Sequence, residues 1–317
     1  MITLSPLGFC RWRQAIGLAL GLVAAATSPG ATAGAPAPDP APDALGAHAR
    51  GVLHQIMTSE RSWVRIHAAE ALIAAGEAEA IRAYFLSELP STESSAFRIG
   101  VWRVLATTAH SVDERNSWIA KVERVYLDPA APDQNQAIET LCKLGYRVSG
   151  PALAIVRQNA AGPPSAPMAL ALWASQIAGE PRALEGLTGL LTSDNPALRT
   201  SAAYALRWLH PSDPAVRGAL ARAVAAEPAG TNVSAYLLSA ALTVDADSAR
   251  TASWQAQLNQ ILFTAAMPAR FEACWTLRHR YQVADLPQVA PLLDLPAAKN
   301  DTRVGAAMVI LTTLAPR

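Results

Sequence analysis

Signatures of catalysis and metal binding are absent from this sequence of 317 residues. It contains no His-Glu-x-x-His segment, no P-loop, no dinucleotide-binding glycine pattern and no Gly-x-Ser-x-Gly elbow. Neither the cysteines nor the histidines have the spacing of zinc ligands. The histidines are His48, His54, His67, His110, His210 and His279. We therefore expect no catalytic residue, no cofactor and no metal, and predict that the protein is not an enzyme.

The sequence also has no run of alternating Val, Ile and Thr that would indicate a sheet, and only 6% of its residues are aromatic. Much of its 51% hydrophobic content is Ala and Leu, which lose little side-chain freedom in a helix. An all-α fold is therefore expected. Lys and Arg (26) nearly balance Asp and Glu (25), so no basic excess is available for nucleic acid.

The N-terminus is typical of a secretory signal peptide. Arg11 and Arg13 precede a short apolar core at 15–26, and Ala31-Thr32-Ala33 is a small-residue cleavage site. The apolar core is shorter than the about 20 residues of a membrane span, although an uncleaved anchor is the alternative. Residues 1–33 are thus predicted to be a signal peptide, which makes the protein periplasmic or secreted, with no membrane insertion after cleavage. Cleavage would leave a net charge near −1.

Residues 34–44 are rich in Pro and Ala and predict an extended linker. The remaining residues, 45–317, carry an internal repeat, the feature that decides the fold. An apolar residue precedes an arginine, small residues follow at +3 and +4, and a leucine follows at +7. The segments at 64–72 and 198–206 are the best examples. Eight copies start at 65, 98, 134, 165, 199, 231, 270 and 303, with spacings of 31 to 39 residues.

Positions +3, +4 and +7 share one face of a helix, so this face is predicted to pack against neighbouring helices. A second predicted helix precedes each copy, for example at 118–127, 181–191 and 213–226. Each unit is then a helix pair that cannot bury its own apolar face and must stack on its neighbours.

This pattern resembles the HEAT-like repeats of bacteria, with Asp194 in the turn before Leu198-Arg199 and an Ala-Ala-x-x-Leu helix behind it. The resemblance covers nearly all of 45–317 and implies an α-solenoid of about eight HEAT-like helix pairs. It also implies that the repeat arginines open the second helix of their pairs. They are Arg65, Arg98, Arg199, Arg270 and Arg303. The copies at 134, 165 and 231 lack this arginine.

Cys142 and Cys274 lie four repeats apart, tens of ångströms in a stacked array of helices about 8–10 Å apart. A disulfide needs Cα atoms within about 7 Å, so both cysteines are predicted to be buried free thiols.

The candidate site lies on the opposite, concave face of the second helices. Its +5 positions change along the chain from Glu70, Arg103 and Glu139 to Leu170, Tyr204, Tyr236, Trp275 and Met308. Trp208 falls on the same side, whereas Trp102 and Trp173 are expected to be packing residues. Because exposed aromatic rings often mark interfaces, a protein or peptide partner is predicted to bind at Tyr204, Trp208, Tyr236 and Trp275.

Three other interpretations remain open. The first concerns the four aromatic rings, which could be packing residues or could stack on a glycan. An envelope enzyme, or a lyase-like HEAT protein, would use a small His/Glu site, either His67 with Glu70 or Glu272 with His279. An accessory subunit of a solute transport system is the third, because 63–72 and 98–105 are similar to HEAT segments fused to sodium–solute symporters.

Overall fold

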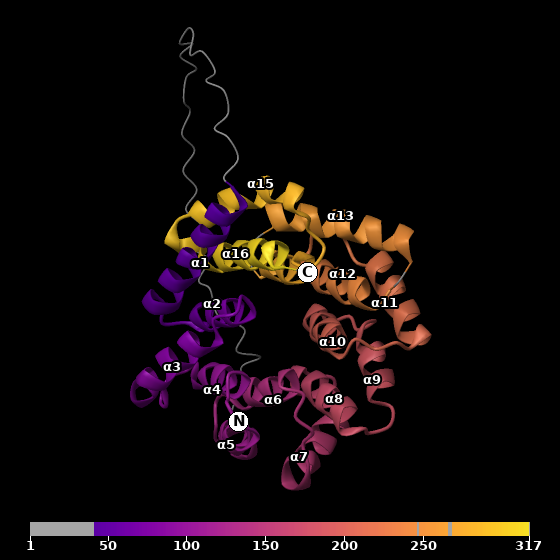
Figure 1. The fold of residues 1–317 in the computed structure, drawn as a ribbon. Helices are drawn as coiled ribbons and strands as arrows, with labels where there is room; N and C mark the ends of the chain where they lie inside the picture. Colours follow the sequence, from indigo (N-terminus) through magenta and orange to yellow (C-terminus); the bar gives the residue numbers. More distant parts are fainter. Residues whose placement is uncertain (1–40, 246, 266–267, 317) are drawn as a thin grey trace, which may run out of the picture. The chain divides into compact units, whose positions relative to one another are not determined.

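The computed structural model describes residues 41–317 except 246, 266–267 and 317, and this part of the chain is all-helical (Figure 1). It contains sixteen α-helices and three short 3-10 segments, and none of the described residues forms a strand. None of these helices is long and apolar enough to cross a membrane. The predicted signal peptide at 1–33 and the linker residues 34–40 lie outside the described residues. Helix α1 begins at Pro42, so the last residues of the predicted linker are helical and the folded part starts before Leu45.

The helices alternate between two sets along the chain. The odd-numbered set is α1 Pro42–Ser59, α3 Ala78–Thr92, α5 Val112–Leu127, α7 Gly150–Ala160, α9 Ala183–Leu190, α11 Pro214–Ala226, α13 Ser248–Thr264 and α15 Leu286–Val289. The even-numbered set is α2 Trp63–Ala74, α4 Arg98–Thr107, α6 Gln134–Lys143, α8 Ala166–Ala178, α10 Pro196–Leu209, α12 Asn232–Val244, α14 Ala269–Leu277 and α16 Asn300–Leu314. The 3-10 segments are η1 Val283–Asp285, η2 Ala290–Asp294 and η3 Ala297–Lys299.

Local sequence explains where many of these helices begin. A short polar side chain accepts a hydrogen bond from the first free amide groups, as Ser165 does at α8 and Thr231 does at α12. A proline with preset φ occupies the first turn of others, including Pro196 in α10 and Pro214 in α11.

The eight predicted repeat copies coincide with the eight even-numbered helices. Each predicted start falls within such a helix or, at Ser165 and Thr231, on its N-cap. The side chains at +3, +4 and +7 are all buried, with the exception of the half-buried Met168. The predicted packing face is therefore confirmed.

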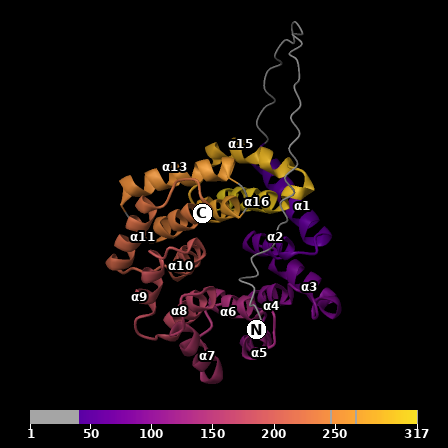
Figure 2. The same cartoon turned by 180° about the vertical axis from the view of Figure 1, so that it is seen from behind.

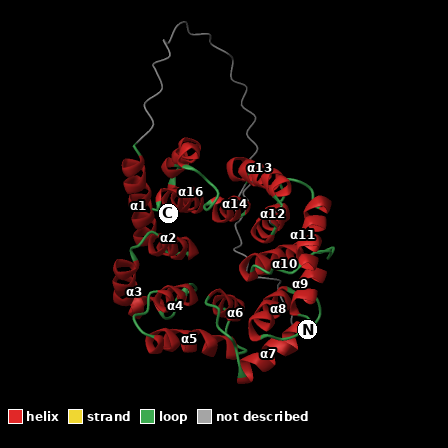
Figure 3. Cartoon of the chain, turned by 45° about the vertical axis from the view of Figure 1, so that its right-hand side comes forward, coloured by secondary structure: helices red, strands yellow, loops and turns green. Residues whose placement is uncertain are grey.

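The even-numbered helices form a closed circle of contacts. Each contacts the next even-numbered helix in the chain, and α16 contacts both α1 and α2 (Figures 2 and 3). Polar contacts join the two ends: Asn300 donates to Glu60 at 2.7 Å, and Arg303 donates to Gln55 at 3.3 Å. Within residues 41–317 the helix pairs consequently have no free end.

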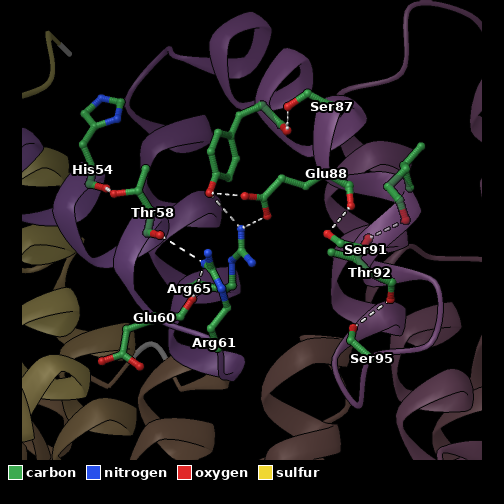
Figure 4. A network of polar contacts seen from close by, with 12 residues as sticks. His54, Thr58, Glu60, Arg61, Arg65, Ser87, Glu88, Ser91, Thr92 and Ser95 are labelled. Carbon is green, nitrogen blue, oxygen red and sulfur yellow. Dashed lines mark hydrogen bonds and ion pairs between the residues drawn. The ribbon is translucent and has the colours of Figure 1, made fainter.

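Four of the five repeat arginines bind the next helix pair around the circle. Arg65 is 1% exposed and donates to Glu88, with which it forms an ion pair (Figure 4). The remaining partners are Asp133 for Arg98, Glu227 for Arg199, the carbonyl oxygen of Phe263 for Arg270 and Gln55 for Arg303. Arg270 is the exception, because Phe263 lies on α13 of its own pair. Since Arg303 reaches α1 as Arg65, Arg98 and Arg199 reach their following pair, closure of the circle repeats the contacts between successive pairs.

Close approach of α14 and α16 predicts the effect of adding one methyl group at Gly305. A Cβ atom there would lie 2.7 Å from Sγ and 2.9 Å from Cβ of the buried Cys274. We expect Gly305→Ala to lower the free energy of unfolding by about 1–3 kcal/mol through overpacking. Gly51 in α1 is the matched control, because a Cβ atom there meets nothing within 4 Å. Gly51→Ala should stabilise the helix by about 0.5–1 kcal/mol. Urea unfolding of both variants tests these two predictions, and equal changes in the free energy of unfolding would contradict them.

Candidate functional site

The four predicted site residues come together inside the helix circle. Tyr204 and Trp208 lie on α10, Tyr236 on α12 and Trp275 on α14, and all four side chains are half-buried. Ring centroids are 6.1 Å apart between Tyr204 and Tyr236 and 5.6 Å apart between Trp208 and Trp275. Two further rings extend the group. We call Trp173, Tyr204, Trp208, Tyr236, Phe271 and Trp275 the interior aromatic cluster.

Side chains of the interior also link inner helices that are not direct neighbours. The Tyr204 hydroxyl on α10 donates to Glu139 on α6 at 2.7 Å, past α8, which lies between these helices. The ring of His67 on α2 lies 4.9 Å from that of Phe271 on α14, past α16. The concave face expected from the sequence is thus the inside of a closed circle, and only part of each ring is accessible.

The packing role predicted for Trp102 and Trp173 agrees with their burial. Trp102 is 6% exposed, and Trp173 is 1% exposed beneath Tyr204 and Trp208. Trp173 therefore supports the accessible rings from below, which fixes their orientation.

Three ion pairs surround the cluster. Glu70 accepts from Arg103 at 2.6 Å, Glu139 pairs with Lys143 at 2.8 Å, and Glu272 pairs with Arg207 at 2.7 Å. We call Glu70, Glu139 and Glu272 the paired interior acids. Each has a cation from its own helix or from another inner helix.

Burial and neighbouring charge set the pKa values of these acids in opposite directions. Burial raises the pKa of Glu70, but Arg103 and a hydrogen bond from His67 outweigh burial and hold this pKa far below its usual range. For Glu272, burial raises the pKa more than the charge of Arg207 lowers it. Burial also raises the pKa of Tyr204 well above its usual range, so this phenol stays neutral and can donate to Glu139.

Cations gather where three inner helices end. Lys143 is the last residue of α6, Arg207 lies in the last turn of α10 and Arg278 is the C-cap of α14. The helix dipole favours positive charge at these ends. Each cation also lies over a ring: Lys143 is 5.5 Å from the Trp208 centroid, and Arg278 is 4.1 Å from the Trp275 centroid.

The two alternative His/Glu sites have different surroundings. His67 contacts Glu70 at 3.2 Å, and both side chains are half-buried in the interior. Glu272 is buried against Arg207, whereas His279 is exposed. No group of three or more His, Cys, Asp or Glu side chains among the described residues is arranged to hold a metal ion.

Sequence reasoning missed the interior cations and one ring, namely Lys143, Arg207, Arg278 and Phe271. The cations lie at +8 or +9 of their repeat copies, beside the column of +5 residues from which the site was predicted. The sequence signal for them was available, since Trp208 at +9 was assigned to the same side.

Both cysteines of the described chain are buried and free, as predicted. Burial raises the pKa of the Cys142 thiol well above its usual range and that of Cys274 to about 12. The thiols are therefore protonated and act as packing groups.

Comparison of the chain with family models, curated proteins and solved structures found no match.

Proposed function

We propose that this chain is an exported, non-enzymatic scaffold that binds a protein or peptide partner at the interior aromatic cluster. Export follows from the predicted signal peptide at 1–33. The main support for this proposal is one contiguous and partly accessible aromatic surface. It is formed by four rings from three inner helices, namely Tyr204, Trp208, Tyr236 and Trp275.

The proposed scaffold is a solenoid of eight HEAT-like helix pairs that closes on itself. Its support is the coincidence of the repeat copies with the even-numbered helices and the arginine contacts between successive pairs. Rigid supports favour binding because little side-chain freedom remains to be lost when a partner docks. The rings meet this condition, since Trp173 and the ion pairs hold them from below and from the side.

Aromatic rings are also the residue type that contributes most to many protein interfaces. They supply contact area with few rotatable bonds, and truncation of one such anchor often costs about 2 kcal/mol of binding free energy or more. A partner segment that covers the four rings would exclude water from an apolar surface whose other side is already packed against buried residues.

Selection from a phage-displayed random dodecapeptide library on the purified protein tests this proposal. We expect peptides to be enriched, and Trp275→Ala to weaken binding of the synthetic peptides at least tenfold, about 1.4 kcal/mol, by titration calorimetry. Phe263→Ala is the matched control, because this half-buried ring lies on the odd-numbered helix α13. It should leave the affinity unchanged.

Two results would contradict the proposal. One is the absence of enriched peptides, or enrichment of peptides whose affinity is equal for Trp275→Ala and the unaltered protein. The other is loss of cooperative thermal unfolding in both Trp275→Ala and Tyr236→Phe, which would show that the rings are core residues.

A further inference from the structure

Arg278 is the interior cation without an acidic partner. Glu70, Glu139 and Glu272 are paired with Arg103, Lys143 and Arg207. No carboxylate of the described residues forms an ion pair with Arg278. The hydrogen bond of its guanidinium goes to the carbonyl oxygen of Trp275.

The guanidinium of Arg278 is held against Trp275, one ring of the interior aromatic cluster. Its central carbon lies 4.1 Å from the ring centroid of Trp275, the shortest cation–ring distance in the described structure. Arg278 follows Trp275 by three residues, so both side chains lie on the same face of α14. One bond to a carbonyl oxygen leaves most of the five N–H groups of an arginine available to an acceptor.

Arg207 adds positive charge beside Arg278. His210 and His279 also lie close enough to feel the charge of Arg278. Partial desolvation lowers the pKa of both exposed imidazoles, assisted by the charges of Arg207 and Arg278 at His210 and by that of Arg278 at His279. Glu272 acts on Arg278 as well, but its carboxylate is bound by Arg207.

We propose that the partner segment carries an Asp or Glu side chain that pairs with Arg278, next to an apolar residue that packs on Trp275. This inference rests on the proposed function and specifies the chemistry of the partner. A carboxylate matches the fork of a guanidinium and can accept two parallel hydrogen bonds. Stacking on Trp275 orients the guanidinium plane in advance, which reduces the entropy lost on binding. The structure favours an acidic polypeptide segment because the rings beside the cation form an apolar surface for its neighbouring side chain.

The test uses the peptides enriched from the dodecapeptide library, with each Asp or Glu replaced by Asn or Gln in a matched synthetic set. We expect acidic residues to be enriched, and the neutral replacement at one position to weaken binding to the unaltered protein at least tenfold. In Arg278→Gln the acidic and neutral peptides should bind equally. Arg222→Gln removes the same charge from an exposed position on α11 and should preserve the preference.

The outcomes separate this inference from the proposed function. Peptides that bind and lose affinity with Trp275→Ala, but show no acidic preference, would overturn the role of Arg278 and leave the aromatic site intact. An acidic preference that persists in Arg278→Gln would assign it to another cation and overturn the inference too. If no peptide is enriched, both proposals fail. As an independent readout, an acidic peptide should shift the NMR resonances of His210 and His279, because its carboxylate changes the charge beside their rings.

Discussion

Arg207→Met should lower the free energy of unfolding by about 3–5 kcal/mol. Arg207 and Glu272 form an ion pair whose side chains are 7% and 4% exposed. Removal of one partner leaves a buried charge without compensation, and this penalty exceeds the net contribution of the pair itself. Urea unfolding at neutral pH measures the effect.

A double variant separates the burial penalty from the value of the pair. Arg207→Met combined with Glu272→Leu should regain most of the lost stability, because both buried charges are then absent. Arg157 pairs with Glu180 at the surface, so Arg157→Met is the matched control and should change stability far less. A double variant no more stable than Arg207→Met would contradict the expectation.

The loss of stability in Arg207→Met should depend on pH in a defined direction. Burial already raises the pKa of Glu272 above its ordinary value, and loss of Arg207 removes the charge that opposes this rise. A carboxyl group with a higher pKa in the folded state stabilises the fold below its unfolded pKa, and this stabilisation is lost as pH rises through the folded value. The deficit of Arg207→Met should therefore be smaller at pH 4 than at pH 8.

Leu53→Ala should destabilise the protein by about 3 kcal/mol and should also loosen α16. Leu53 is fully buried in α1, a helix that packs against both α2 and α16. A Leu→Ala change in a core costs about 2–5 kcal/mol. Val112→Ala is the control, because Val112 is 72% exposed. Chemical denaturation measures the change in the free energy of unfolding for both variants.

Hydrogen exchange distinguishes the closed circle from an open array. In an open array, a change in α1 would be felt by the adjacent pair and would fade with distance along the chain. In the closed circle, Leu53→Ala should increase amide exchange in 304–311 of α16 as much as in α2. Faster exchange in α2 alone would show that α16 does not depend on α1.

The all-helical fold and the buried face of the inner helices were predictable because the predicted repeat pattern describes packing between helices that are neighbours in the chain. Alanine at +3 and +4 and leucine at +7 describe how one inner helix packs on the next. Burial follows that pattern even in the copies at 134, 165 and 231, apart from the half-buried Met168. Closure was not predicted, since α1 and α16 meet through residues such as Glu60 and Asn300 that no period relates. One sequence signal pointed to it. Helix α16 is apolar around its whole circumference over 304–311, whereas the terminal helix of an open array needs a polar outer face.

The candidate site was predictable in part for the same reason. The column of +5 residues placed Tyr204, Tyr236 and Trp275 on one face correctly. The bond from Tyr204 to Glu139 depends on the diameter of the circle, because these residues come from helices that are not neighbours. Periodicity within single helices carries no information about that diameter.

Contact between α1 and α16 also constrains when the chain can finish folding. The hydrogen bond between Glu60 and Asn300 spans 240 residues, whereas successive helix pairs join residues that follow each other closely in synthesis. A growing chain can stack its pairs in order, but the apolar side of α1 that α16 covers stays exposed until α16 itself is made. Until α16 is made, α1 has an uncovered apolar side, and a chain that lacks α16 should therefore be prone to aggregation.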